Sequence, residues 1–156
     1  MEIKQKKRDE IPAQYKWNLC DLYPTDADWR KAADSIEGET EAIKAFEGKL
    51  TTGEAILACM EKYYAVCETV SRVYQYANLK QSEDANVSES QAMADIAEGL
   101  DADFEETTAF ITPEILTHDE AAIRDFINGT PGLKLYEHHL NNLLRKKAHV
   151  LSAEME

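Results

Sequence analysis

The chain has 156 residues, of which 44% are hydrophobic and 30% are charged, a composition typical of one globular domain with a buried core. Its formal net charge of -13 argues against a nucleic-acid-binding protein, because binding to phosphates needs clustered lysine and arginine. The same charge argues against docking on anionic lipid. No apolar run approaches the roughly 20 residues of a membrane span. We therefore expect neither nucleic acid nor a membrane as a partner.

Few turn-forming residues interrupt the chain, which has only six glycines and four prolines. Connections are therefore few and elements long, which favours helices. We predict an all-α fold of about five helices, arranged as antiparallel hairpins or a bundle. Residues 1–14 lack an apolar pattern and are predicted to be a flexible N-terminal segment, followed by a helical lobe over residues 15–151. Trp17, Leu19, Leu22 and Tyr23 precede Pro24 and should pack against this lobe as a short strap.

Two long helices are predicted first. One begins at Thr25 or Asp26, where a capping-box pattern lies, and ends at Gly48. The other has its start signal at Thr51 and Glu54, a hydroxyl N-cap with an acid three residues on. Its apolar residues recur in steps of four and three, a period of 3.5 that favours packing on a nearly antiparallel neighbour: Ile56, Met60, Tyr63, Cys67, Val70, Tyr74 and Ala77.

A third helix with the same period is predicted from about Asn86 to Ile111, ended by Pro113. Its inward positions are Met93, Ala97, Leu100, Phe104, Thr107 and Ile111. The polar segment KQSEDAN joins it to the second helix, so the two should form an antiparallel hairpin.

The remaining helices are predicted to be shorter. Thr117 and Glu120 form a capping-box pattern for a brief helix, and the segment NGTPG then breaks the chain. A last helix should run to about Lys147 with one inward face, made of Leu133, Tyr136, Leu140 and Leu143. Ser152 is a candidate N-cap, so residues 152–156 are predicted to be the truncated start of a following helix.

The four histidines do not match a metal-binding pattern. His138 and His139 are adjacent, so on a helix they point about 100° apart and cannot share one metal. We expect His138 to point outward and His139 to lie on the flank of the inward face. His149 lies roughly 15 Å further along if the segment is helical, and His118 lies in a predicted loop. No His-Glu-x-x-His or Glu-x-x-His occurs. We predict no metal ligand in this chain.

No catalytic pattern is present either. The sequence has no Gly-rich phosphate loop and no Gly-x-Ser-x-Gly elbow. Cys20, Cys59 and Cys67 have no histidine near them in sequence. Cys59 and Cys67 should lie about 12 Å apart along one helix, too far for a disulfide, and are interpreted as free thiols of a reducing cytoplasm. We predict no catalytic or cofactor-binding residue.

Two further groups of side chains allow a functional and a structural interpretation. The basic triplet at 145–147 is a candidate phosphate or peptide-carboxylate patch, but the favoured interpretation is a set of cations at a helix C-terminus. Four tyrosines are candidates for a peptide groove, although the first and third fit the buried seam of their helix better: Tyr63, Tyr64, Tyr74 and Tyr76.

Four segments carry a family resemblance: YKWNLCDLYPTDADW, RVYQYANL, FITPEIL and LYEHHLNNLLRKKAHVLSAEME. In their order along the chain and their residue patterns, these segments resemble the N-terminal lobe of oligoendopeptidase F, a zinc metallopeptidase of the thimet-oligopeptidase (M3) family. The resemblance runs from about Ile11 to the end of the chain. Its most specific parts are the opening Trp-Asn-Leu-x-Asp-Leu-Tyr-Pro and the closing Leu-Leu-Arg-x-Lys-x-His-x-Leu-Ser.

The resemblance implies a cytoplasmic enzyme of two helical lobes that cuts short peptides in a deep channel. Its zinc is held by His-Glu-x-x-His and a downstream glutamate, in a C-terminal part with no counterpart here. The chain is thus expected to be a non-catalytic lobe, inactive alone, that forms a channel wall and limits substrate size. Its expected partners are the catalytic part of the same enzyme, short peptides, and a second copy of itself. The alternative is a free-standing acidic helical interaction module.

Overall fold

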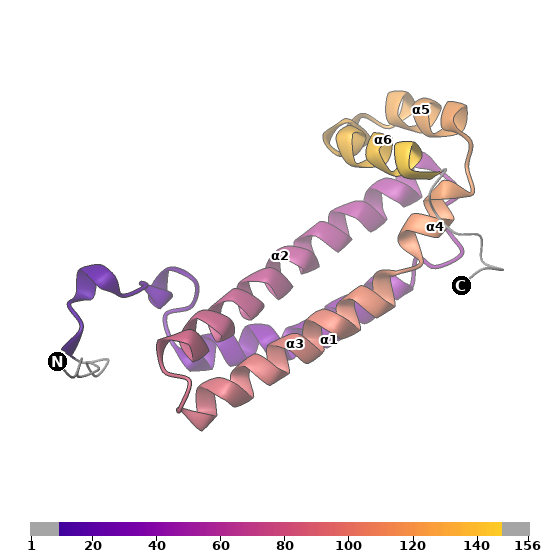
Figure 1. Cartoon of the computed structure of the whole chain (residues 1–156). Helices are drawn as coiled ribbons and strands as arrows, with labels where there is room; N and C mark the ends of the chain where they lie inside the picture. The colour runs from indigo at the N-terminus through magenta and orange to yellow at the C-terminus, as the bar shows by residue number, and fades with distance from the viewer. Residues whose placement is uncertain (1–9, 148–156) are drawn as a thin grey trace. The chain divides into compact units, whose positions relative to one another are not determined.

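A computed structural model of the chain describes residues 10–147, and all regular elements in that range are helical (Figure 1). The predicted helix start at 152–156, His149 and most of the predicted N-terminal segment lie outside these residues. The prediction of an all-α fold is confirmed. The α-helices are α1 (Asp26–Lys44), α2 (Gly53–Glu83), α3 (Ser88–Thr108), α4 (Ile111–Leu116), α5 (Glu120–Gly129) and α6 (Glu137–Lys146). Short 3-10 helices are η2 (Ala13–Tyr15), η3 (Leu19–Asp21) and η4 (Pro131–Tyr136).

The chain divides into two compact units, each built from two stretches of sequence. Unit 1 consists of Met1–Gly38 and Val66–Phe104, and unit 2 of Glu39–Ala65 and Glu105–Glu156. The boundaries between the units fall inside α1, α2 and α3, so each of these helices contributes to both cores.

Unit 1 has a core formed by the first part of α1, the second part of α2 and most of α3. Trp29 is 1% exposed, and its indole Nε1 donates a hydrogen bond of 2.9 Å to the carbonyl of Val73, which satisfies the buried polar atom. After the short connection at 84–87, α3 runs back along this part of α2, which confirms the predicted hairpin within unit 1 (Figure 1). Further buried residues are Ala33, Ile36, Val66, Val70, Ala77, Met93, Ala97 and Phe104.

The start of α1 is held by polar contacts at both ends of its first turn. The Thr25 hydroxyl accepts from the backbone N–H of Asp28 at 3.2 Å and donates to the Asp28 carboxylate at 2.7 Å, as the capping-box pattern predicted. Asp26 accepts a 2.7 Å hydrogen bond from the Tyr76 hydroxyl and forms an ion pair with Lys80. These contacts lower the pKa of Asp26, with the Lys80 hydrogen bond as the largest cause.

The predicted strap packs at its end and not at its start. Arg72 donates a hydrogen bond of 2.7 Å to the carbonyl of Leu22, and the ring of Tyr23 meets that of Tyr76 edge-on with centroids 5.5 Å apart. Trp17, by contrast, is 54% exposed. The expectation that Trp17 packs against the lobe is therefore wrong, whereas Leu19, Leu22 and Tyr23 of the strap are half-buried.

Unit 2 contains the shorter helices and the turn after α1. The Glu114 carboxylate on α4 accepts from the backbone N–H groups of Gly48 at 2.9 Å and Leu50 at 2.6 Å. Gly48 has a φ of +73°, a left-handed conformation that glycine adopts without steric cost. These hydrogen bonds join the turn to α4. The buried core of unit 2 includes Ile43, Leu50, Ile56, Met60, Ile115, Ile123, Leu133 and Leu140.

Several predicted helix boundaries are wrong. The first helix ends at Lys44 and not at Gly48, which lies in the turn that follows. The third helix does not reach Ile111, because α3 ends at Thr108 and α4 begins at Ile111. Pro113 does not end a helix but lies in the first turn of α4. Backbone N–H groups in the first turn make no hydrogen bond within the helix, so proline, which has no N–H, is tolerated there. The hydroxyl that caps α2 belongs to Thr52 and not to Thr51, since Thr52 Oγ1 accepts from the N–H of Ala55 at 3.2 Å.

The predicted cap of the brief helix is also displaced. Thr117 is still in helical conformation at the end of α4, and its hydroxyl donates to the carbonyl of Glu114 at 2.7 Å. Asp119 has extended backbone, and its carboxylate accepts from the N–H of Ala122 at 2.7 Å. An N-cap needs this non-helical backbone, so Asp119 caps α5.

Candidate peptide-contact site

The four candidate tyrosines of α2 lie in different surroundings. Tyr76 is 5% exposed and belongs to the core of unit 1, so it lines no groove. Tyr74 is half-buried in the same unit, and Tyr63 and Tyr64 belong to unit 2, where Tyr64 is 37% exposed. The prediction that Tyr63 and Tyr74 are core residues holds only in part, since both are half-buried. Only Tyr63 and Tyr64 are therefore placed together as candidates for contact with a ligand.

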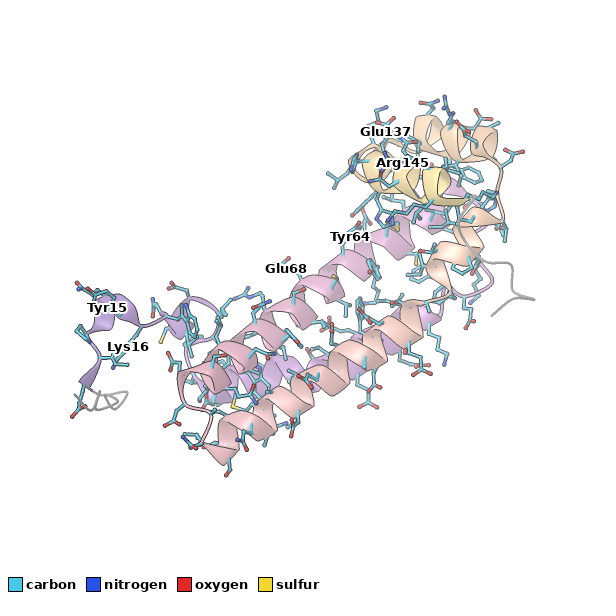
Figure 2. All side chains as sticks on the ribbon, in the orientation of Figure 1. Tyr15, Lys16, Tyr64, Glu68, Glu137 and Arg145 are labelled. Atoms are coloured by element: carbon cyan, nitrogen blue, oxygen red, sulfur yellow. The ribbon has the colours of Figure 1, made fainter. Side chains whose placement is uncertain are left out.

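Tyr64 lies at the centre of an aromatic cluster in unit 2, on α2 (Figure 2). Its ring stacks on that of Tyr136, with centroids 5.3 Å apart and planes 15° apart. It meets the ring of Tyr63 edge-on at 5.3 Å and the imidazole of His139 edge-on at 5.9 Å. Both geometries are preferred arrangements of aromatic pairs and place a rigid, partly exposed surface here.

A hydrogen bond of 2.9 Å joins the Tyr64 hydroxyl and Nδ1 of His139. Burial lowers the pKa of His139, and the positive charges of His138 and Lys146 lower it further. The imidazole is therefore neutral at neutral pH, with one donating and one accepting nitrogen. When Nδ1 accepts from the Tyr64 hydroxyl, Nε2 carries the proton and can donate to a ligand carbonyl.

A small cavity of about 210 Å³ adjoins the aromatic cluster within unit 2. Apolar groups of Met60 and Ile111 form part of its wall, and His139 and Glu105 add an imidazole and a carboxylate. The remaining lining residues are Tyr63, Thr108, Ala109 and Thr112. An apolar hollow with a few polar groups is typical of a site that accepts one side chain of a ligand.

The histidines of the described residues are engaged in separate hydrogen bonds. His118 Nε2 lies 2.7 Å from the carbonyl of Leu50, and His138 Nε2 lies 2.9 Å from the amide of Asn142. His138 is exposed and His139 half-buried, as the helical face predicted. Between residues 10 and 147, no three His, Cys, Asp or Glu side chains come close enough together to hold a metal ion. These residues do not fit a zinc site.

The basic triplet lies where helix polarity predicts. Arg145 and Lys146 occupy the last turn of α6, and Lys147 is its C-cap. The Lys147 ammonium also donates to the carbonyl of His118 at 2.9 Å, which is a contact inside unit 2. In the described part of the chain, no helix combines the length and the apolar character that crossing a membrane requires.

Comparisons with known proteins agree with the fold. The M3 N-terminal family described as Oligopeptidase F matches residues 114–156. The plasmid oligoendopeptidase F of Lactococcus lactis subsp. cremoris is 30% identical over 153 residues, which are 97% of this chain and 26% of that protein. Oligopeptidase PepF of Bacillus subtilis is 29% identical over 150 residues, 96% of this chain and 22% of that protein. The chain thus spans about a quarter of the length of the curated relatives it matches.

Solved structures show the same relation. Oligoendopeptidase F from Enterococcus faecium has a TM-score of 0.76 and 26% identity, covering 84% of this chain and 26% of that one. A Chlamydophila abortus protein superposes with a TM-score of 0.84 over 97% of this chain, and at 23% identity it supports the fold alone. Fold and sequence together show similarity to a helical portion of M3 peptidases. More narrowly, the chain is similar to the N-terminal part of oligoendopeptidase F, the family that the quoted motifs resemble.

Proposed function

We propose that the chain is a non-catalytic lobe of an oligoendopeptidase F-like enzyme, and that in the whole enzyme it forms a wall of the channel in which short peptides are cleaved. The observation that carries this proposal is the alignment of 97% of the chain with 26% of a lactococcal oligoendopeptidase F. In this role the lobe acts by binding and by limiting substrate size. We further propose that the enzyme works in the cytoplasm.

The chemistry of the described residues supports a role other than catalysis. Residues 10–147 do not fit zinc, so the zinc of the whole enzyme would be held by other residues. When bound there, zinc supplies an activated water for hydrolysis. The surface around Tyr64, Tyr136 and His139 offers aromatic faces and a neutral imidazole instead. Such groups suit contact with an extended peptide.

Two experiments test this proposal. The gene is read beyond the codon of Glu156, where an in-frame His-Glu-x-x-His is expected. The purified 156-residue chain is then examined by metal analysis and with a set of internally quenched peptides, and we expect neither stoichiometric zinc nor cleavage. One zinc ion per chain together with cleavage of a peptide would overturn the proposal.

The alternative is a free-standing interaction module that binds a partner through its acidic and tyrosine-bearing surfaces. The net charge of -13 and the partly exposed Tyr64 favour it. A stop codon directly after Glu156 supports this alternative, and a downstream metal-binding motif rejects it.

A further inference from the structure

A second hollow lies between α5 and α6, separate from the aromatic cluster. These two helices pack against each other in unit 2 (Figure 1). The groove has a volume of about 520 Å³, within the usual range of small-molecule sites. Side chains from α5 and α6 line it, with Glu137 and Arg145 both projecting from α6 (Figure 2). The full lining is Glu120, Arg124, Ile127, Asn128, Glu137, Asn141, Leu144 and Arg145.

The carboxylates of the groove already have cationic partners. Glu120 pairs with Arg124 at 2.5 Å, and Glu137 pairs with Lys134 at 3.0 Å. Arg145 differs, because among residues 10–147 its guanidinium donates only to the neutral side-chain oxygen of Asn142, at 2.9 Å. No carboxylate within residues 10–147 lies at ion-pair distance from Arg145. In a chain of net charge -13, this is a place where an added anion meets a guanidinium that has no carboxylate partner in the described part of the chain.

Amide donors and an apolar floor complete the groove. The side-chain amides of Asn128 and Asn141 form no hydrogen bond with any part of the chain that the structure describes, and both residues are exposed. Ile127 is 4% exposed and Leu144 is half-buried, so their side chains form an apolar surface beside the polar groups. A guanidinium and two amides bind a carboxylate well, and the apolar surface suits an adjoining aliphatic group.

We propose that the α5–α6 groove binds a carboxylate carried beside an apolar group, with Arg145 as its anchor. Two sources share this chemistry: the C-terminus of a peptide that ends in an apolar residue, and an aspartate or glutamate side chain next to one. The inference rests on the groove alone. It can fail while the proposed role of the chain as an enzyme lobe stands, and the reverse is also true.

Calorimetric titration of the 156-residue chain with three blocked peptides tests the proposal. The first is N-acetylated and ends in leucine with a free carboxylate, the second is its C-terminal amide, and the third is an amide that contains a glutamate beside leucine. We expect the amide without a carboxylate to bind at least about tenfold more weakly than the better acidic peptide. Which of the two acidic peptides binds tighter identifies the source of the carboxylate.

Four variants assign the site to the groove. Arg145→Gln should weaken binding of the better acidic peptide about tenfold, because it removes the anchoring charge. Glu120→Gln should strengthen peptide binding, because the Glu120 carboxylate then no longer competes with the peptide carboxylate for Arg124. The control Arg30→Gln breaks a similar exposed ion pair on α1, with Asp34 at 3.9 Å, and should change nothing. Arg145→Lys keeps the charge and should recover part of the affinity.

Circular dichroism of each variant verifies that the helical fold is retained. Opposite effects of Arg145→Gln and Glu120→Gln would not arise from a general loss of structure. The proposal is overturned if the amide binds as tightly as both acidic peptides, if no peptide binds, or if Arg145→Gln and Arg30→Gln behave alike.

Discussion

The three cysteines differ in their surroundings, and this difference could not be derived from their spacing. Cys59 is fully buried, Cys67 is half-buried and Cys20 is exposed, and all three are free thiols. The predicted apolar repeat of the second helix contained Cys67 and not Cys59, yet Cys59 is the more deeply buried of the two. The exposure of Cys20 depends on where the strap packs, which is decided by contacts of Leu22 and Tyr23 with residues far away in sequence.

We predict that the thiols react at well-separated rates. Burial raises the pKa of Cys59 to about 11, and the negative charge of Glu114 adds to this effect. With 5,5′-dithiobis(2-nitrobenzoate) at pH 8, Cys20 should react fast and Cys59 only after unfolding in denaturant. The variant Cys20→Ser should lose the fast phase. Equal rates for Cys20 and Cys59 in the native chain would contradict the buried position of Cys59.

His139 should make stability depend on pH. Its pKa in the folded state is lowered from the ordinary value of about 6.5, so the unfolded chain binds the proton more tightly. The stabilisation is therefore complete above about pH 6.5 and is lost as the pH falls through the lower, folded pKa. Urea unfolding between pH 8 and pH 5 should show this loss in the wild type and much less of it in His139→Gln. The control His138→Gln, at an exposed position, should keep most of the loss, since burial is the main cause.

At the scale of elements, the capping residue of α5 provides a direct test of the structure against the sequence pattern. Asp119→Ala should reduce the free energy of unfolding by about 1 kcal/mol, because it removes the acceptor for the N–H of Ala122. Thr117→Ala should cost clearly less, because the Thr117 hydroxyl only donates to a carbonyl at the end of α4. Both values come from chemical denaturation, and a larger loss for Thr117→Ala would show that the sequence pattern had identified the true cap.

The start of α2 requires glycine for a packing reason. A Cβ at Gly53 would lie 2.3 Å from Oγ1 of Thr130 and 3.3 Å from Cβ of Phe126. Gly53→Ala should therefore lower the free energy of unfolding by about 1–3 kcal/mol. The matched control is Gly129→Ala, whose Cβ would meet nothing within 4 Å, and which should be neutral or slightly stabilising. Thr130→Ala in the Gly53→Ala background should recover part of the loss, and no recovery would point to a different cause.

Helices were predictable from the sequence, and most of their boundaries were not. The apolar repeat of the second helix lies within α2, and the predicted start of the first helix is that of α1. The residues that end α3 and begin α4 depend on tertiary packing, since Ile111 continues the same apolar repeat and yet belongs to the next helix. Caps depend on backbone conformation, which the pattern of hydroxyl and acidic residues does not specify.

At the scale of the whole molecule, we predict that the chain associates with itself. A lobe that packs on a larger body leaves apolar side chains exposed when it is alone, and Leu135 is 81% exposed and Tyr15 72% exposed. Sedimentation velocity over a range of protein concentrations should show an increasing sedimentation coefficient. Leu135→Ser should reduce the increase, with Lys134→Ser as a neighbouring exposed control. A strict monomer at the highest concentration would reject the prediction.

By itself, the sequence determined the helical class, the apolar faces and the similarity to oligoendopeptidase F, because periodicity and motif order are local properties of the chain. Tertiary structure alone decided which tyrosines are available for contact. It placed Tyr76 in a core, joined Tyr64 to His139 and aligned α5 with α6 around Arg145. These results depend on residues up to 75 positions apart, such as Tyr64 and His139. Helical spacing relates only residues a few positions apart on one helix, so it cannot predict such contacts.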